Sequence, residues 1–272
     1  MKLKEALKGK LTPKEFDLLK GSYDTLGSIA IIEIPPELEK KEKLIGNTLL
    51  DLQKNIRTVA KKTGIHSGEF RLRKLKIIAG RRSKETEYKE NNVRLLLHAE
   101  KVYFSPRLST ERKRIMEKVR PGETVLVMFS GVGPYVFVIS RNTGAREVYG
   151  VEVNPEAHKY ALRNRELNKA QNVKLYLGDV RKVVPKIRKR FDRIIMPLPR
   201  GAENFLDTAL AASRRGTTIH FYDFEREEEM PDASFEKIRK AAGRKEYEIL
   251  GWNRCGNYGP GKYRVCVDFR VM

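Results

Sequence analysis

The alternation of strand-like and helix-like segments is the feature that most constrains the fold of this chain. From Thr124 onward, short apolar segments typical of strands are separated by stretches with helical spacing of apolar residues. The expected strands are TVLVMF (124–129), EVYGVEV (147–153), VKLYLGD (173–179), RIIMPL (193–198), TTIHFYDF (217–224) and YRVCVDFRV (263–271). Because alternating β and α elements pack as a parallel sheet between helices, this half is expected to form a doubly wound α/β sheet. The closing segment alternates apolar and polar residues, which predicts an antiparallel strand at the sheet edge.

The preceding residues have a different pattern. Apolar residues recur at helical spacing over the first 20 residues, a short apolar strand covers 28–34, and an amphipathic helix is expected over 37–53. From Arg57 to Tyr103, short strand-like segments alternate with turn residues. We therefore expect two domains: a smaller α+β domain built on an antiparallel sheet over residues 1–115, and the doubly wound domain over 116–272.

The positive charge is concentrated in one part of the chain. The 272 residues carry 56 Lys and Arg against 35 Asp and Glu, a net charge of +21, and residues 51–120 alone hold 20 basic and 8 acidic side chains. The charge-rich surface of a heat-adapted protein is the alternative, but such a surface balances its signs. An unbalanced basic block is typical of proteins that bind a phosphate backbone. Residues 51–120 are therefore expected to form an RNA-binding face.

Composition excludes several classes of protein. No apolar run is long enough to cross a membrane, and the first residues carry charges throughout instead of an apolar signal core. Cys255 and Cys266 are too few for a disulfide framework or a four-ligand zinc site. We therefore expect a cytoplasmic, monomeric protein that requires neither a metal nor a membrane.

A glycine turn follows the first strand of the doubly wound half. Ser130-Gly131-Val132-Gly133-Pro134 leads into a helix, and Glu152 lies 21 residues beyond Gly131 at the end of the next strand. Glycines at such a turn let the backbone approach a ligand, and an acidic residue at the second strand end binds ribose hydroxyls. The chain lacks a phosphate-binding GxxxxGK[ST] loop and the third glycine of a dinucleotide site. The pattern favours an adenosine cofactor without pyrophosphate, S-adenosyl-L-methionine.

Several motifs together resemble one enzyme family. In order along the chain they are SGEFRLRKLKIIAG (67–80), SPRLSTER (105–112), MFSGVGP (128–134), YGVEVNP (149–155), GDVRKV (178–183), MPLPRGAENFL (196–206) and IHFYDF (219–224). From about residue 25 the chain resembles the archaeal and eukaryotic tRNA guanosine-37 N1-methyltransferases, which belong to the S-adenosylmethionine-dependent, Rossmann-like methyltransferases. The resemblance implies methyl transfer to N1 of the guanine 3′ of the anticodon. Two alternatives stay open: a wybutosine-pathway aminocarboxypropyl transferase, and an RNA-binding relative with weakened catalysis.

The resemblance also implies roles for individual residues. Guanine N1 carries a proton that a carboxylate must accept, and the charge that develops on O6 needs a cation. The family motif assigns these roles to Glu111 as base and to Arg107 and Arg71 as cations, with Arg73 as the neighbouring possibility. Without the resemblance, Glu111 is interpreted as part of a surface ion pair with Lys113 or Arg114. Arg107 and Arg71 are then interpreted equally well as contacts to phosphate. The cofactor-binding residues expected from the glycine turn, the strand ends and the resemblance are Tyr103, Phe129, Ser130, Gly131, Gly133, Pro134, Glu152, Val153, Asn154, Asp179, Val180 and Pro197. Asn154 is also expected to cap the helix that Pro155 begins, and Tyr103 reads equally well as a core residue.

Two positions depart from the family pattern. Val127 stands where family members carry an acidic residue at the end of the first strand, and Pro197 stands where they carry an asparagine that holds the target guanine. Proline offers neither an amide side chain nor a backbone N–H donor. Recognition of guanine is therefore expected to depend on other groups, such as the backbone carbonyls near Met196.

Overall fold

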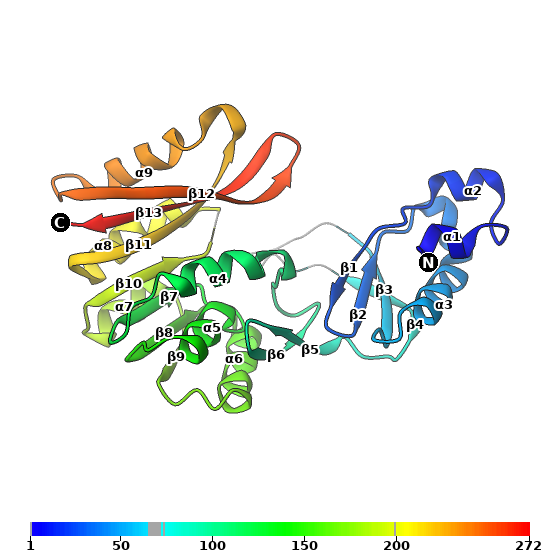
Figure 1. The fold of residues 1–272 in the computed structure, drawn as a ribbon, viewed down its shortest axis with the longest axis horizontal. Coiled ribbons are helices and arrows are strands. Elements are labelled where there is room, and N and C mark those ends of the chain that lie inside the picture. Colours follow the sequence, from blue (N-terminus) through cyan, green and yellow to red (C-terminus); the bar gives the residue numbers. More distant parts are fainter. Residues whose placement is uncertain (1, 65–71, 73, 199) are drawn as a thin grey trace. The chain divides into compact units, whose positions relative to one another are not determined.

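The computed structural model describes residues 2–64, 72, 74–198 and 200–272. The chain divides into an N-terminal unit, Met1–Lys89 with Arg94–Pro106, and a C-terminal unit, Glu90–Val93 with Arg107–Met272 (Figure 1). The expected boundary at 115/116 would cut helix α4 (Ser109–Glu117), whereas the division places this helix wholly in the C-terminal unit. The reason is that α4 packs against helix α5 (Pro134–Asn142), with Ile115 fully buried.

The C-terminal unit contains a seven-stranded sheet with the order β12-β13-β11-β10-β7-β8-β9. The strands are β7 (Thr124–Met128), β8 (Glu147–Glu152), β9 (Val173–Leu177), β10 (Phe191–Met196), β11 (Ser213–Arg226), β12 (Tyr247–Gly259) and β13 (Lys262–Val271). The five strands from β11 to β9 pair in parallel, and β13 and β12 are antiparallel. The predicted doubly wound α/β fold is confirmed.

The closing strand does not form the edge of this sheet, contrary to the sequence-based expectation. β13 lies between β11 and β12, and β12 is the edge strand. Almost every side chain of β13 is buried because both of its faces are covered, whereas β12 alternates between half-buried and exposed residues. The alternation of apolar and polar residues in β13 therefore marks two different buried faces, one apolar and one filled by a polar network.

Helices cover both faces of the sheet (Figure 1). The face that carries Met196, Phe221 and Phe269 packs against α7 (Val180–Ile187), α8 (Leu206–Ala212) and α9 (Asp232–Ala242), and these elements form the apolar core. The other face carries α4, α5 and α6 (Pro155–Leu167). Short 3-10 turns, η2 (Pro106–Leu108), η3 (Ala202–Phe205) and η4 (Glu227–Glu229), complete this unit.

The N-terminal unit has its own mixed sheet, with the order β1-β2-β3-β4. Its strands are β1 (Tyr23–Leu26), β2 (Ile29–Ile32), β3 (Thr58–Lys62) and β4 (Leu75–Gly80), its helices are α1 (Leu3–Leu7), α2 (Pro13–Leu18) and α3 (Glu42–Leu52), and η1 (Pro36–Lys41) precedes α3. The prediction of an antiparallel sheet is wrong at one pair, because β2 and β3 are parallel. The cause is η1 and α3, since a strand–helix–strand crossover returns the chain in the same direction. Strands β5 (Glu85–Glu90) and β6 (Val93–His98) form a separate two-stranded sheet.

Among the described residues, no helix has the length and apolar character needed to cross a membrane.

Candidate active site

The turn after β7 has a backbone conformation that requires glycine. Gly131 and Gly133 have φ angles of 57° and 90°, in the left-handed region. A Cβ at Gly133 would lie 2.2 Å from Cε2 of Phe137, so a side chain there would be excluded by both the angle and the space. The Gly133 N–H donates to the Ser130 carbonyl at 2.9 Å, and Pro134 begins α5 at once. The chain thus presents bare backbone at the start of a helix, as an adenosine cofactor needs.

Glu152 joins the end of β8 to this turn. Its Oε2 accepts the Gly131 N–H at 2.7 Å and its Oε1 accepts the Asn154 N–H at 2.8 Å. Burial raises the pKa of Glu152, and the backbone donors oppose that shift. The Val153 N–H also bonds this carboxylate, which leaves lone-pair capacity for a ribose hydroxyl. The neighbouring Val153 is 40% exposed and supplies an apolar surface beside it.

The other predicted contacts at this edge of the sheet have local structural roles. Asn154 caps α6, because its Oδ1 accepts the Glu156 N–H at 3.0 Å. Asp179 caps α7 and pairs with Arg181 at 2.6 Å, a hydrogen bond that lowers the pKa of Asp179. Val180 packs its side chain into the core, so it could contact a cofactor only through its backbone.

Pro197 lies just beyond β10, where the chain turns. The Leu198 N–H donates to the Met196 carbonyl at 2.8 Å. One lone pair of the Met196 carbonyl is therefore used within this turn, and the role of the backbone carbonyls near Met196 in guanine recognition stays a prediction. Phe129 packs edge-on against Phe205 with ring centroids 4.9 Å apart, and these rings line the same end of the sheet.

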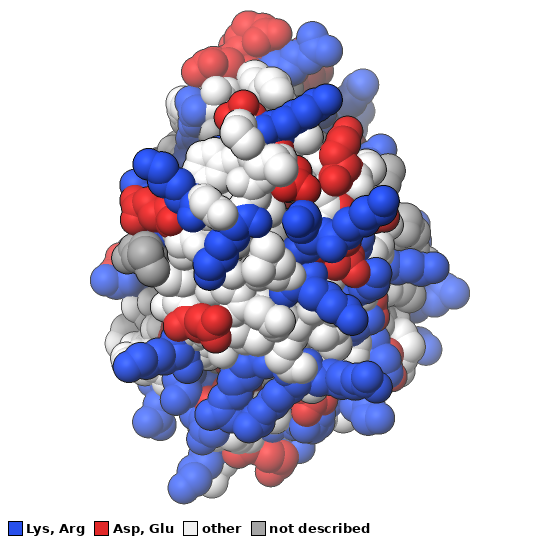
Figure 2. All heavy atoms as spheres, turned by 90° about the vertical axis from the view of Figure 1, so that its right-hand side faces the viewer, with Lys and Arg blue, Asp and Glu red and all other residues white. Residues whose placement is uncertain are grey.

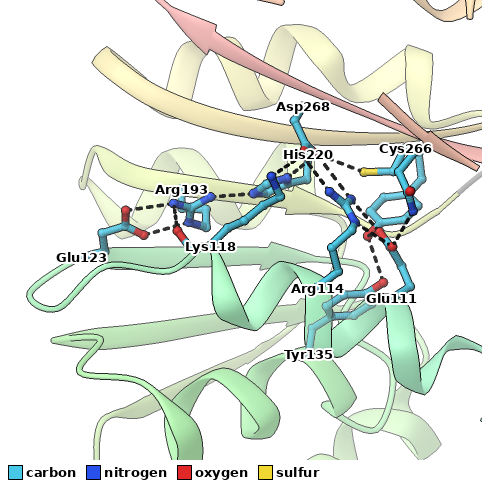
Figure 3. Close-up of polar contacts among 11 residues, drawn as sticks. Glu111, Arg114, Lys118, Glu123, Tyr135, Arg193, His220, Cys266 and Asp268 are labelled. Carbon is cyan, nitrogen blue, oxygen red and sulfur yellow. Dashed lines mark hydrogen bonds and ion pairs between the residues drawn. The ribbon is translucent and has the colours of Figure 1, made fainter. Parts of the chain in front are cut away.

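Glu111 is buried, contrary to the alternative of an exposed ion pair. It lies in the first turn of α4 and is 4% exposed (Figure 3). Arg114 donates to both carboxylate oxygens, from Nε to Oε2 at 2.8 Å and from Nη2 to Oε1 at 2.7 Å. The Tyr222 hydroxyl donates to Oε1 at 2.6 Å and the Asn253 amide to Oε2 at 3.2 Å. Four donors converge on this group, which is the environment of an ionised carboxylate.

Two tyrosines connect Glu111 to the glycine turn. The Tyr135 hydroxyl donates to the Tyr222 hydroxyl at 3.0 Å, and Tyr222 donates to Glu111. Tyr135 is the second residue of α5 and follows Gly133 by two positions. Burial raises the pKa of both tyrosines, so both keep their protons at neutral pH. Two hydrogen bonds thus connect the Glu111 carboxylate to Tyr135 at the start of α5, and the glycine turn directly precedes this helix.

The remaining predicted catalytic residues are Arg107 and Arg71, and Tyr103 is the remaining predicted cofactor contact. Arg107 is exposed on η2, four positions before Glu111. Tyr103 is half-buried in the N-terminal unit, and Arg71 and Arg73 lie outside the described residues. Val127, which replaces the expected acidic residue, is fully buried in β7.

Sequence reasoning missed most of the residues that surround Glu111. Tyr222, Asn253 and Asp268 come from three strands of the C-terminal half and carry no motif that points to Glu111. The sequence could have predicted only the contact of Arg114, because this residue lies three positions after Glu111 on one helix and the two side chains can pair there. At the cofactor edge, Leu177 was also missed; it is 50% exposed at the end of β9 and offers apolar surface there.

A cavity opens at the opposite edge of the sheet from the glycine turn, by the amino ends of β7, β8 and β10. Its volume is about 1020 Å³, and its lining includes Lys118, Arg193, His220 and Asp268. This cavity contains none of the glycine-turn residues. It therefore lies apart from the predicted cofactor edge.

The doubly wound sheet, the glycine turn after β7 and Glu152 at the end of β8 define an S-adenosylmethionine-dependent methyltransferase of Rossmann-like fold. Residues 86–250 match the TRM5/TYW2 methyltransferase domain, and residues 3–83 match the TYW2 N-terminal domain. The chain belongs to the TRM5/TYW2 methyltransferase family. The resemblance therefore begins near the N-terminus, earlier than residue 25.

Individual relatives are similar over most of their length. The tRNA (guanine(37)-N(1))-methyltransferase Trm5b of Pyrococcus abyssi is 42% identical over 93% of this chain and 76% of its own. The tRNA (guanine(37)-N(1))/4-demethylwyosine(37)-methyltransferase Taw22 of Nanoarchaeum equitans is 33% identical over 92% of this chain and 100% of its own. The crystal structure of P. horikoshii TYW2 in complex with MeSAdo superimposes with a TM-score of 0.84 at 25% identity, covering 99% of this chain and 98% of that one.

Proposed function

We propose that this chain transfers the methyl group of S-adenosylmethionine to N1 of guanosine 37 in tRNA. The observation that carries the proposal is the buried Glu111 carboxylate, joined through Tyr222 and Tyr135 to the start of α5. This arrangement supports the proposal, because a buried carboxylate near the glycine turn can serve as a proton acceptor in a family whose relatives are named tRNA methyltransferases.

The proposed chemistry needs one electrophile, one base and one cation. The cofactor supplies a methyl group on a positively charged sulfur. As the bond between guanine N1 and the methyl carbon forms, the bond between that carbon and the cofactor sulfur breaks and leaves a neutral thioether. Glu111 accepts the N1 proton, so the guanine is not left positively charged. Arg107, at the other end of the same short segment, is proposed to stabilise the negative charge on O6. Glu152 and the backbone at Gly131 orient the adenosine.

The proposed tRNA-binding surface includes cations of the N-terminal unit. Figure 2 shows a face on which Lys and Arg side chains are abundant. Arg57, Arg81 and Arg82 are exposed arginines of the N-terminal unit, and the Arg81 N–H donates to the Arg57 carbonyl at 2.8 Å, which brings the first two close together. Lys61 and Lys62, which sequence charge alone would include, instead form ion pairs with Glu39 and Glu33. The basic block 51–120 is therefore only partly available to phosphate.

Replacing Arg57, Arg81 and Arg82 together with glutamine is expected to weaken tRNA binding and reduce its dependence on salt. Each lost phosphate contact lowers the slope of log K against log salt by slightly less than one, so the slope should fall by about 2 to 3. Fluorescence anisotropy of labelled tRNA between low and high salt measures it. Lys8, Lys10 and Lys14 replaced by glutamine make a control with the same change of net charge. An equal fall in both triple variants would remove these arginines from the interface.

A second candidate function is methylation of 4-demethylwyosine at position 37. Pro197 favours it, because this residue cannot offer the side-chain amide or the N–H with which guanine would be recognised. The bifunctional name of the N. equitans relative shows that both reactions occur in one similar protein. The third possibility, aminocarboxypropyl transfer, uses another carbon of the same cofactor.

One experiment separates these functions. The protein is incubated with S-adenosylmethionine labelled either in the methyl group or in the carboxypropyl chain, and with tRNA carrying guanosine, adenosine or 4-demethylwyosine at position 37. Methyl label in 1-methylguanosine, and none in the adenosine-37 tRNA, supports the proposed function. Methyl label only in the 4-demethylwyosine tRNA supports the second candidate, and label only from the carboxypropyl chain supports the third. Binding of tRNA without any transfer would contradict an enzymatic role.

A further inference from the structure

A row of alternating charges runs from Glu111 across the sheet to the cavity at its amino edge (Figure 3). Arg114 bonds Glu111 on one side and donates from Nη1 to Asp268 Oδ2 at 2.8 Å on the other. Asp268 Oδ1 lies 2.6 Å from His220 Nδ1, and His220 Nε2 lies 2.7 Å from Arg193 Nη1. Arg193 is held in turn by Glu123 at 2.7 Å and by the Lys118 carbonyl at 2.5 Å.

The hydrogen-bond donors in this row determine the tautomer of His220, that is, which ring nitrogen carries the proton. A guanidinium can only donate, so Nε2 of His220 must accept from Arg193. The imidazole proton is therefore on Nδ1, from which it donates to Asp268. Burial lowers the pKa of His220, and this fully buried ring is neutral. Arg193 thus fixes the one tautomer that can stabilise the Asp268 carboxylate.

Asp268 carries a full charge beside Arg114. Burial alone would raise the pKa of Asp268, but the hydrogen bonds from His220 and Arg114 and the positive charge of Arg114 outweigh that and hold it below the ordinary value. The groups facing Asp268 are His220 on β11, Arg114 and Lys118 on α4, and Cys266 on β13. Those facing Glu111 include Arg114, Tyr222, Asn253, Tyr135, Cys255 and Cys266. The Arg114 guanidinium therefore contacts both carboxylates, and within the described part of the chain it is the cation whose ion pairs join them.

The same residues do not form a metal centre. One ligand atom each of His220, Cys266 and Asp268 lies within 4.8 Å of the others. However, Nδ1 carries a proton, burial raises the pKa of the Cys266 thiol well above its usual value, and Arg114 and Lys118 occupy the carboxylate. A cation would have to displace two existing cations and two protons, so the cluster fits a hydrogen-bonded charge network.

We propose that Asp268, oriented by His220, is a positioning residue for the methyl transfer: it shares Arg114 with Glu111 and thereby keeps the Glu111 carboxylate available to accept a proton. This inference rests on the proposed function of Glu111 as the base. A guanidinium facing a single carboxylate holds it as a tight ion pair and weakens it as a base. A second anion on the far side of the guanidinium offsets part of that attraction, and it also repels the charge on Glu111.

The test compares two variants that should move the pH dependence in opposite directions. Asp268→Asn removes the second anion, so Glu111 should hold a proton less readily: the acid limb of the profile of kcat/KM should move to lower pH, and the maximal single-turnover rate should fall about tenfold. His220→Phe removes the donor that stabilises Asp268, so its charge acts more strongly on Arg114 and Glu111. The acid limb should then move to higher pH. Dissociation constants for tRNA and for S-adenosylmethionine should change less than about threefold.

Asp192→Asn is the matched control, since the Asp192 side chain is also ion-paired at the amino edge of the sheet but bonds Arg214 and the Thr124 N–H instead of a side chain of this row. It should leave the acid limb unchanged. Equal profiles for wild type, Asp268→Asn and His220→Phe would overturn the inference, as would shifts in the same direction. If Asp268→Asn fails to fold, as circular dichroism would show, the shift in His220→Phe alone decides. A wild-type protein that transfers no methyl group would instead contradict the proposed function itself.

Discussion

Glu111→Gln is expected to lower the single-turnover rate of methyl transfer by at least about 100-fold while leaving tRNA affinity nearly unchanged. Glutamine keeps the size of the side chain and can still accept from Tyr222, but it cannot take a proton from guanine N1. Rapid-quench measurement of labelled 1-methylguanosine gives the rate, and anisotropy gives the affinity. Asp268 remains as a partner of Arg114, so the variant does not leave that guanidinium without an anion.

The control for this variant is Glu117→Gln on the same helix. Glu117 is exposed, and its ion pair with Lys113 is long, at 3.8 Å. The charge of Glu117 should therefore contribute little to the rate of methyl transfer or to the stability of the fold. Thermal unfolding of both variants separates a loss of chemistry from a loss of folded protein. Activity in Glu111→Gln close to that of the wild type would exclude Glu111 as the base.

Glu152→Gln is expected to raise the dissociation constant of S-adenosylmethionine about 100-fold. The amide replaces one acceptor oxygen with a donor that faces the N–H of either Gly131 or Asn154, which disturbs the turn as well as the ribose contacts. Losing hydrogen bonds to a charged acceptor costs about 1.5–3 kcal/mol each, so one to two lost bonds account for this factor. Isothermal titration calorimetry with the cofactor measures the constant directly.

Glu166→Gln serves as its control, because Glu166 is an exposed carboxylate that forms an ion pair with its neighbour Arg165 at 3.1 Å. Its affinity for the cofactor should equal that of the wild type. Unchanged cofactor affinity in Glu152→Gln would show that this carboxylate serves the turn and not the ligand.

The cofactor edge could be predicted because its signals are local. The glycine turn, the acidic strand end and the Asn154 cap each depend on residues a few positions apart, and the backbone conformations they require restrict the residue types. Two predictions about the sheets were wrong. The parallel pairing of β2 with β3 follows from the crossover through η1 and α3, and the central position of β13 could not be read from its pattern. The alternating pattern of β13 is the same whether its polar face meets water or a buried network, so the pattern alone cannot tell an edge strand from a central one.

The roles of Arg71, Arg107 and Tyr103, the domain boundary as a functional division, the monomeric state and the location in the cytoplasm stay predictions. The family, the fold, the cofactor and the class of reaction are confirmed, because the sequence motifs, the sheet order and the similar proteins agree.

The sequence by itself determined that this chain forms a doubly wound sheet with an adenosine-binding turn, because hydrophobic periodicity and glycine spacing act over short stretches of chain. Only the tertiary structure decided what surrounds Glu111. Tyr222, Asn253 and Asp268 stand 111 or more residues further along the chain than Glu111, and they meet it or its partner Arg114 because β11, β13 and β12 pair side by side. The hydrogen-bond donors and charges around a buried carboxylate decide whether it can act as a base. Which residues supply them depends on the order of the strands, and a local sequence pattern does not predict that order.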